Sequence, residues 1–365
     1  MVNLQESSDT QAGSTPVEIR DADPPFNHST ADFIFRSRDH VDFRVHKALV
    51  SLASPSFDGL LSLPPPITDG IVSINEVKDG LPVIPFPEDQ QTLLYLLCSC
   101  HGFAPDVLPP LTVQGLKSVC AAHDKYVITA IHPRVHDTFI SVAKEDPVAV
   151  YAIACHYRMD KLMLAAAKLS LLEPALHLSH SPELGLITGL QYSNLIHYHQ
   201  ECKEVAANFA SKDWSWCHSL SDVPLGQATS ACPTCRTQLI LEPTTVVNGS
   251  VLDGNTGKYI FYAPSWWFQF LTDGTTSAKL KETPCGSAIR DRAFLAPVLK
   301  KAVSCANVEC RLGVPEMLDF CDRFAAAVDE AVSRVRFLRI LLRLPYTCLI
   351  LLRRQVTFPT AYPNT

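Results

Sequence analysis

The chain has 365 residues, a length typical of two or three domains. Hydrophobic residues make up 47% of it, which is enough to fill real cores. The formal net charge of -6 argues against a broad nucleic-acid surface, because phosphate contacts need clustered Lys and Arg. The only dense basic run spans residues 334–354, so a polyanion-binding tail is the one alternative that composition leaves open.

Cysteine usage and the N-terminus indicate the compartment. The 13 cysteines are scattered along the chain and do not form the frame of a small disulfide-rich domain. Residues 1–25 are polar and acidic, with no apolar run that could act as a signal peptide. We therefore expect an intracellular protein of the cytoplasm or nucleus, with most thiols reduced. Five cysteines lie in apolar helical patterns and are predicted to be small buried hydrophobes: Cys98, Cys100, Cys120, Cys155 and Cys202.

A hairpin followed by short helices is predicted near the N-terminus. Residues 1–29 read as a disordered arm. The segment 41–45 alternates apolar and polar residues, and together with 31–35 it predicts a β-hairpin. Ser54 is placed to cap a helix that has Pro55 at its first position. The other elements predicted up to residue 126 are helices at 47–53, 88–100 and 112–126 and strands at 71–74 and 81–84.

The rest of the chain changes texture twice. Cap-and-proline signals at Asp146-Pro147 and Ser181-Pro182 open helices in a helical stretch. Beyond residue 211 the chain is rich in Trp, Cys, Gly and Pro, and we expect a loop-rich region with a thin core. The helices predicted here cover 147–154, 161–172, 182–209 and 315–342. The predicted class is α+β, divided into 1–29, 30–130, 131–210, 211–342 and a tail at 343–365.

One stretch carries a family resemblance. Asp32 precedes the first hairpin strand, and Phe43-Arg44-Val45-His46-Lys47 ends the second. Four residues follow at set offsets: Leu49, Ser54, Phe57 and Leu61. This pattern resembles the signature of the BTB (POZ) domain, in which a hairpin ending in His-Lys leads to a helix and an S-x-x-F turn. The resemblance implies a BTB/POZ-like domain at 30–130, with protein binding as its activity and self-association through apolar residues such as Leu49 and Leu52.

The likeness extends over about residues 30–340. The phrases at 79–83, 150–155 and 197–202 are similar to those of an expanded group of fungal BTB proteins. The function implied is a non-enzymatic scaffold or adaptor with protein partners. An alternative is a substrate adaptor of a cullin-type ubiquitin ligase, although residues 63–69 lack the hydrophobic-x-Glu motif of cullin-binding adaptors. Copurification with a cullin would separate these two readings. A third reading is an enzyme with an unrecognised site in 211–310, but the common nucleotide, hydrolase and metalloprotease motifs are missing from the sequence.

Two close cysteine pairs are the best metal candidates. Cys232-Pro233-Thr234-Cys235 is a C-x-x-C knuckle, and Cys305 and Cys310 form a second pair. Zinc prefers four thiolate or imidazole ligands in a tetrahedron, commonly supplied by two such pairs. We therefore predict a structural zinc site, with reduced buried thiols and a redox C-x-x-C as alternatives. The substitute ligands are Cys217, His218 and Cys285.

Three other groups of residues could be taken for a catalytic site, a metal site or a membrane span, and the sequence argues against each. Asp32, His46 and Lys47 lie where strands meet a helix and suggest a satisfied polar pocket. The run from His197 to Cys202 is rich in ligand-type residues, yet residues two apart on a helix face different directions. The apolar stretch 337–352 is interrupted by arginines and is too short to span a bilayer, so we expect at most a membrane-surface or partner-binding helix.

Overall fold

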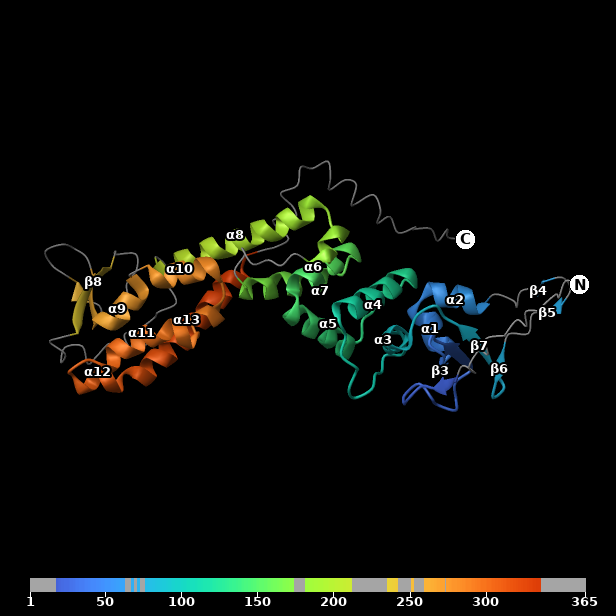
Figure 1. Cartoon of the computed structure of the whole chain (residues 1–365). Helices are drawn as coiled ribbons and strands as arrows, with labels where there is room; N and C mark the ends of the chain where they lie inside the picture. The colour runs from blue at the N-terminus through green and yellow to red at the C-terminus, as the bar shows by residue number, and fades with distance from the viewer. Residues whose placement is uncertain are drawn as a thin grey trace, which may run out of the picture. The chain divides into compact units, whose positions relative to one another are not determined.

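The protein consists of two compact units, residues 1–146 and 147–365, shown in a computed structural model (Figure 1). The first unit combines a mixed β-sheet with helices, and the second is mostly helical, so the predicted α+β class is confirmed. The structure describes residues 18–62, 67–68, 71–72, 76–173, 181–211, 235–241, 251–252, 259–272 and 274–335.

A five-stranded sheet organises the first unit. Its strand order is β1-β3-β2-β7-β6. The strands are β1 (Arg20–Asp21), β2 (Phe33–Arg36), β3 (Val41–Val45), β6 (Val77–Lys78) and β7 (Leu81–Pro85). The predicted hairpin is confirmed, because β2 and β3 pair antiparallel with Phe35 opposite Phe43. In contrast, β7 pairs parallel to β2, and two helices lie between β3 and β7 in the chain. A separate two-stranded pair joins β4 (Ile67–Thr68) and β5 (Ile71–Val72).

The helices of this unit are α1 (Lys47–Ala53), α2 (Pro55–Ser62), α3 (Gln90–His101), α4 (Val113–Lys125) and α5 (Pro133–Glu145). Helix α5 packs on α3 and α4. The Ser54 hydroxyl accepts a hydrogen bond from the backbone N–H of Phe57 at 3.1 Å and so caps α2. The ring of Phe57 stacks on Tyr126 with centroids 4.8 Å apart and also meets Phe35 and Phe86. This aromatic cluster connects the sheet, α2 and the end of α4 in one core.

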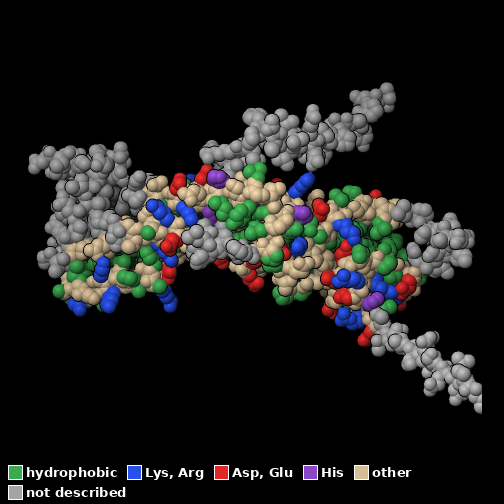
Figure 2. Space-filling model, turned by 45° about the horizontal axis from the view of Figure 1, so that its top comes forward, with side chains coloured by type: hydrophobic (Ala, Val, Ile, Leu, Met, Phe, Trp, Pro, Cys, Tyr) green, Lys and Arg blue, Asp and Glu red, His purple; other side chains and the backbone are tan. Residues whose placement is uncertain are grey.

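A charged network with a buried centre lies across the sheet. The Arg36 guanidinium donates to both carboxylate oxygens of Asp42 at 2.6 and 3.0 Å, although the Asp42 side chain is fully buried. Lys78 donates to the same carboxylate at 2.8 Å and to Asp21 at 2.7 Å. The Glu76 carboxylate accepts hydrogen bonds from Nη1 of Arg36. The network therefore links β1, β2, β3 and β6, and acidic and basic side chains lie intermixed on this unit's surface (Figure 2).

The second unit is built from helices and one small sheet. Its helices are α6 (Pro147–His156), α7 (Asp160–Leu169), α8 (Gly189–Ser211), α9 (Ser265–Thr272), α10 (Thr275–Glu282), α11 (Arg292–Val303), α12 (Val308–Leu312) and α13 (Val314–Ser333). Strands β8 (Arg236–Leu241) and β9 (Val251–Leu252) flank β10 (Tyr259–Pro264), and both pair with it antiparallel. Helix α6 is buried from Pro147 to Cys155, as its nearly continuous apolar sequence requires.

The helical segments differ from the prediction in two ways. The single helix predicted over 182–209 is broken: a 3₁₀ turn at Pro182–Leu186 ends before α8. Thr188 explains the break, because its hydroxyl accepts from the Gln191 backbone N–H at 3.2 Å and so starts a new helix. The region expected to be loop-rich instead carries α9, α10 and α11, with the tryptophans of α9 buried.

Gly286 is fixed by a close backbone approach to α13. A Cβ at this position would lie 2.4 Å from the Ala325 carbonyl oxygen, and the Gly286 N–H donates to Asp329 at 2.6 Å. We therefore expect Gly286→Ala to destabilise the second unit by roughly 1–3 kcal/mol, because α13 must move away. Chemical denaturation followed by tryptophan fluorescence would measure the loss. Gly185→Ala is the matched control, since nothing lies within 4 Å of its added Cβ; equal losses in both variants would contradict the explanation.

Candidate metal centre

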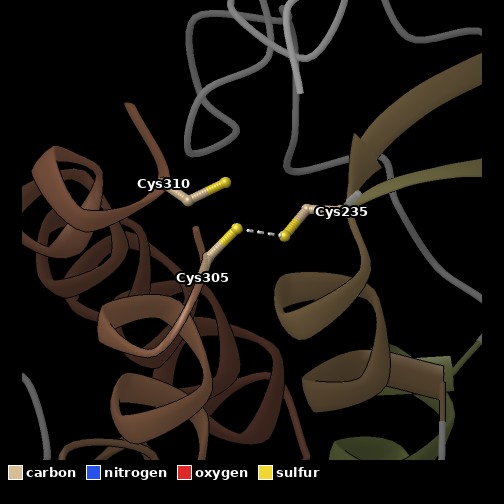
Figure 3. A group of neighbouring side chains, drawn as sticks. All are labelled: Cys235, Cys305 and Cys310. Carbon is tan, nitrogen blue, oxygen red and sulfur yellow. Dashed lines mark hydrogen bonds between the residues drawn. The ribbon is translucent and has the colours of Figure 1, made fainter. Parts of the chain in front are cut away.

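Three cysteines from separate parts of the second unit point their sulfurs toward one another (Figure 3). Cys235 directly precedes β8, Cys305 lies in the link between α11 and α12, and Cys310 lies within α12. The three Sγ atoms all lie within 4.8 Å of one another. Cys235 and Cys305 are the nearest pair, with 2.8 Å between their Sγ atoms.

Local structure explains why Cys235 reaches this point. Strand β8 pairs with β10 along its whole length, so Arg236 lies opposite Pro264. The Ser265 N–H at the start of α9 then donates to the Cys235 carbonyl oxygen at 2.5 Å. Helix α9 in turn packs on α11, where the rings of Phe270 and Phe294 are 5.6 Å apart. The strand pairing and the helix packing together bring Cys235 to the end of α11.

The other two cysteines come from one short segment. Helix α11 ends at Val303, and the Cys305 N–H donates to the Ala302 carbonyl at 3.3 Å, which turns the chain back. Cys310 follows on α12 and is only 1% exposed, whereas Cys305 is partly accessible. Of these two thiols, that of Cys310 is deeply buried and that of Cys305 is partly exposed.

This donor set could hold a metal ion. Thiolates are the soft ligands that zinc and monovalent copper prefer. Four sulfurs at about 2.3 Å from a zinc ion stand roughly 3.8 Å from one another. The three sulfurs here are spread over a similar range, so the Cys235–Cys305 pair would open by about 1 Å on coordination. Of the predicted ligands, the structure brings together Cys235, Cys305 and Cys310, while Cys232 falls outside the described residues.

The substitute ligands do not join this cluster among the residues that the structure describes. The Cys285 Sγ lies 3.0 Å from the Ser287 hydroxyl, at the turn against α13. Cys217 and His218 fall outside the described part of the chain. The five cysteines predicted to be buried are buried, and burial raises the pKa of the Cys98 and Cys120 thiols to about 12. Such thiols are packing residues and offer no thiolate at neutral pH.

The ligand-rich run on α8 is divided between two faces. His197 is exposed, whereas His199 is 1% exposed and lies 2.8 Å from the Ser170 hydroxyl through Nε2. Burial lowers the pKa of His199 to about 4, so the ring is neutral at physiological pH. Cys202 is buried beside the Tyr198 hydroxyl. His199 and Cys202 are therefore uncharged residues of the core, whereas His197 faces the solvent.

Asp32, His46 and Lys47 connect the hairpin to the helices. The Asp32 carboxylate accepts from the Lys47 backbone N–H at 2.6 Å, at the start of α1. The Lys47 ammonium donates to the Leu61 carbonyl at 3.0 Å, which holds α1 to the end of α2. His46 Nε2 shares a 2.9 Å hydrogen bond with Thr30. Asp32 and Lys47 therefore hold the strand end and the helices together, whereas His46 bonds to Thr30 and its Nδ1 is buried without a hydrogen-bond partner among the described residues.

A pocket of about 560 Å³ opens beside His46, with walls that include Pro25, Phe103 and Pro105. The polar side chains that line it are those of His28, Thr30, His46 and Asp106, and the His28 Nδ1 and the Thr30 hydroxyl lie 2.7 Å apart. Within the described residues no helix is both long and apolar enough to cross a bilayer, and the tail at 337–352 lies beyond them.

Comparison with known proteins adds no relative: no protein-family model matches the chain, and neither does any curated protein.

Proposed function

We propose that the chain is a non-enzymatic protein-interaction scaffold whose N-terminal unit is a BTB/POZ-like domain. The observation that carries this proposal is the order of elements after Asp32. A hairpin ends at His46-Lys47, two short helices follow, and β7 then pairs parallel to the first hairpin strand. Ser54 and Phe57, the S-x-x-F residues, form the cap and the aromatic centre of that unit.

An exposed apolar residue gives this unit a contact surface. Leu52 on α1 is 86% exposed, although the neighbouring Val50 is fully buried. Leu49 lies three residues earlier on the same helix and is half-buried. An apolar face of this kind is stabilised when a partner covers it, and a second copy of the chain is the partner we propose.

We expect Leu52→Asp to abolish this self-association. Light scattering at tens of micromolar should give the wild-type chain about twice its 40.2 kDa mass, and the variant a single mass. A charge in a buried interface has no partner and costs several kcal/mol in binding. Val107→Asp is the matched control, because Val107 is 83% exposed in a loop of the same unit. A wild-type chain that remains monomeric would contradict the proposed dimer.

Partner identity is tested separately from self-association. Affinity purification of the tagged full chain, with mass spectrometry, should return a reproducible set of proteins. A double variant with Leu52→Asp and Cys235→Ser tests whether both units contribute to partner binding. Recovery of a cullin in this set would favour the ubiquitin-ligase adaptor, and an empty set at matched expression would contradict the scaffold.

We further propose that the cysteine cluster binds one structural zinc ion, with Cys232 as the fourth ligand beside Cys235, Cys305 and Cys310. The convergence of three thiols from segments 70 residues apart supports this assignment. A C-x-x-C knuckle commonly supplies two ligands to one zinc ion, so Cys232 is the natural fourth. Zinc here would fasten β8 to the α11–α12 link and stabilise the second unit.

A further inference from the structure

The two nearest thiols of the metal centre differ in accessibility. Cys235 is 8% exposed, and Cys305 is the most accessible of the three. Their sulfurs are 2.8 Å apart, closer to each other than two zinc-bound thiolates stand. Neither residue lies inside a helix or strand, and a side-chain rotation that moves its sulfur leaves the backbone hydrogen bonds of both residues in place (Figure 3).

The distance between the Cys235 and Cys305 sulfurs lies between that of a disulfide and that of two zinc-bound thiolates. A disulfide requires about 2.05 Å between the sulfurs, whereas zinc coordination requires roughly 3.8 Å. Either state is reached by a sulfur displacement of about 1 Å or less from 2.8 Å. The two states exclude each other, because a sulfur in a disulfide no longer offers the thiolate that zinc binds.

We propose that Cys235 and Cys305 form a reversible disulfide when the centre is free of metal, with hydrogen peroxide as the oxidant. The Cys305 thiolate attacks one peroxide oxygen, the O–O bond breaks, and hydroxide leaves and becomes water. This oxidises Cys305 to a sulfenic acid and reduces the peroxide. The Cys235 thiolate then attacks the Cys305 sulfur, and the S–O bond breaks to release a second water. The sum is two thiols and one peroxide giving one disulfide and two waters.

The accessible thiol is the one that meets the oxidant. Cys310 is 1% exposed, so peroxide reaches Cys305 first. Cys310 keeps its thiol within 4.8 Å of the new bond, where thiol–disulfide exchange can move the disulfide to another pair of the three sulfurs. A small external thiol is the reductant that returns the pair to two thiols, and it is itself oxidised to a disulfide. Both bonded states hold the start of β8 against the α11–α12 link, so the unit keeps its fold in either state. The protective effect of the metal rests on the zinc proposed above, whereas the disulfide itself does not.

The test uses the full chain, purified under reductant and divided into a zinc-loaded and a chelator-treated sample. After removal of the reductant, each sample is treated with hydrogen peroxide and its remaining thiols are alkylated. Trypsin with a glutamate-specific protease cuts after Arg236 and Glu309, which separates Cys305 from Cys310. We expect a peptide linked between the Cys235 and Cys305 segments, at least tenfold more abundant in the metal-free sample. Denatured metal-free protein should lose two of its 13 thiols.

Variants assign the link and make it falsifiable. Cys235→Ser should abolish the linked peptide, while Cys232→Ser and Cys310→Ser should retain it. Absence of the link in metal-free wild-type protein would overturn the proposal. Equal amounts with and without zinc would overturn the metal gating alone. If elemental analysis finds no zinc, the zinc proposal fails. A linked peptide in peroxide-treated protein that never met the chelator would then still support the disulfide.

Discussion

Cys235→Ser is expected to abolish zinc binding and to lower the melting temperature of the second unit more than a change of any cysteine outside the proposed ligand set. Closed thiolate sites supply an apparent 10–16 kcal/mol in small zinc-binding peptides, roughly the stability of a whole domain. Loss of one ligand removes most of that contribution, because the remaining thiols cannot complete the tetrahedron. Elemental analysis should find about one zinc per wild-type chain and little in the variant.

The chain carries its own reporter for this change. All four tryptophans lie between residues 214 and 267, within the second unit. Tryptophan fluorescence therefore follows the unfolding of that unit alone. Cys321→Ser is the matched control, because Cys321 is buried on α13 outside the cluster; it should keep its zinc despite some loss of stability. An unchanged zinc content in Cys235→Ser would show that this residue is not a ligand.

Asp42→Asn is expected to destabilise the first unit by roughly 3–5 kcal/mol. The Asp42 carboxylate is fully buried and accepts from Arg36 and Lys78, so its removal leaves a partly buried guanidinium with less compensation. Hydrogen exchange of the β2 and β3 amides should accelerate roughly a hundredfold or more in the variant. Asp79→Asn is the matched control, since its pair with Arg44 is at the surface and contributes about 1 kcal/mol or less. Equal effects of the two substitutions would show that burial of Asp42 does not matter.

The same carboxylate makes the prediction depend on pH. Burial acts to raise the pKa of Asp42, but hydrogen bonds from Arg36 and Lys78 outweigh it and hold the pKa below the ordinary value. A depressed pKa in the folded state contributes stability above the unfolded value of about 3.9 and loses it as the pH falls through the folded value. The difference between wild type and Asp42→Asn should therefore be constant from about pH 5 to 8 and shrink below about pH 4. A difference that grows on acidification would contradict the ion-pair explanation.

Local patterns determined the elements whose causes lie within a few residues. The alternation in residues 41–45 and the Ser54-Pro55 cap depend on backbone geometry and neighbouring side chains alone. Both elements are found where the sequence predicts them. Burial of Cys98, Cys120 and Cys155 followed in the same way from apolar helical spacing.

Elements that depend on distant partners were missed. The sequence places α5 in a helical extension that begins at residue 131 but sets no bounds for the helix, although its buried residues Val135, Phe139 and Val142 lie at helical spacing. Helices α9 to α11 lie in a Gly- and Pro-rich context, and α11 contains Pro297. Tertiary packing overrode that local composition. Trp266, Trp267 and Phe270 of α9 are buried, and this packing against other segments stabilises the helix.

The cysteine cluster shows where the two kinds of information meet. Its residue types and the close spacing of Cys305 and Cys310 are properties of the sequence, and they were enough to nominate soft-metal ligands. Whether Cys235 joins them could not follow from spacing, because 70 residues separate it from Cys305. Only the pairing of β8 with β10 and the packing of α9 on α11 brings these sulfurs together. Such contacts form between residues far apart in the chain, so they arise from the burial of shared apolar surface and not from any local preference.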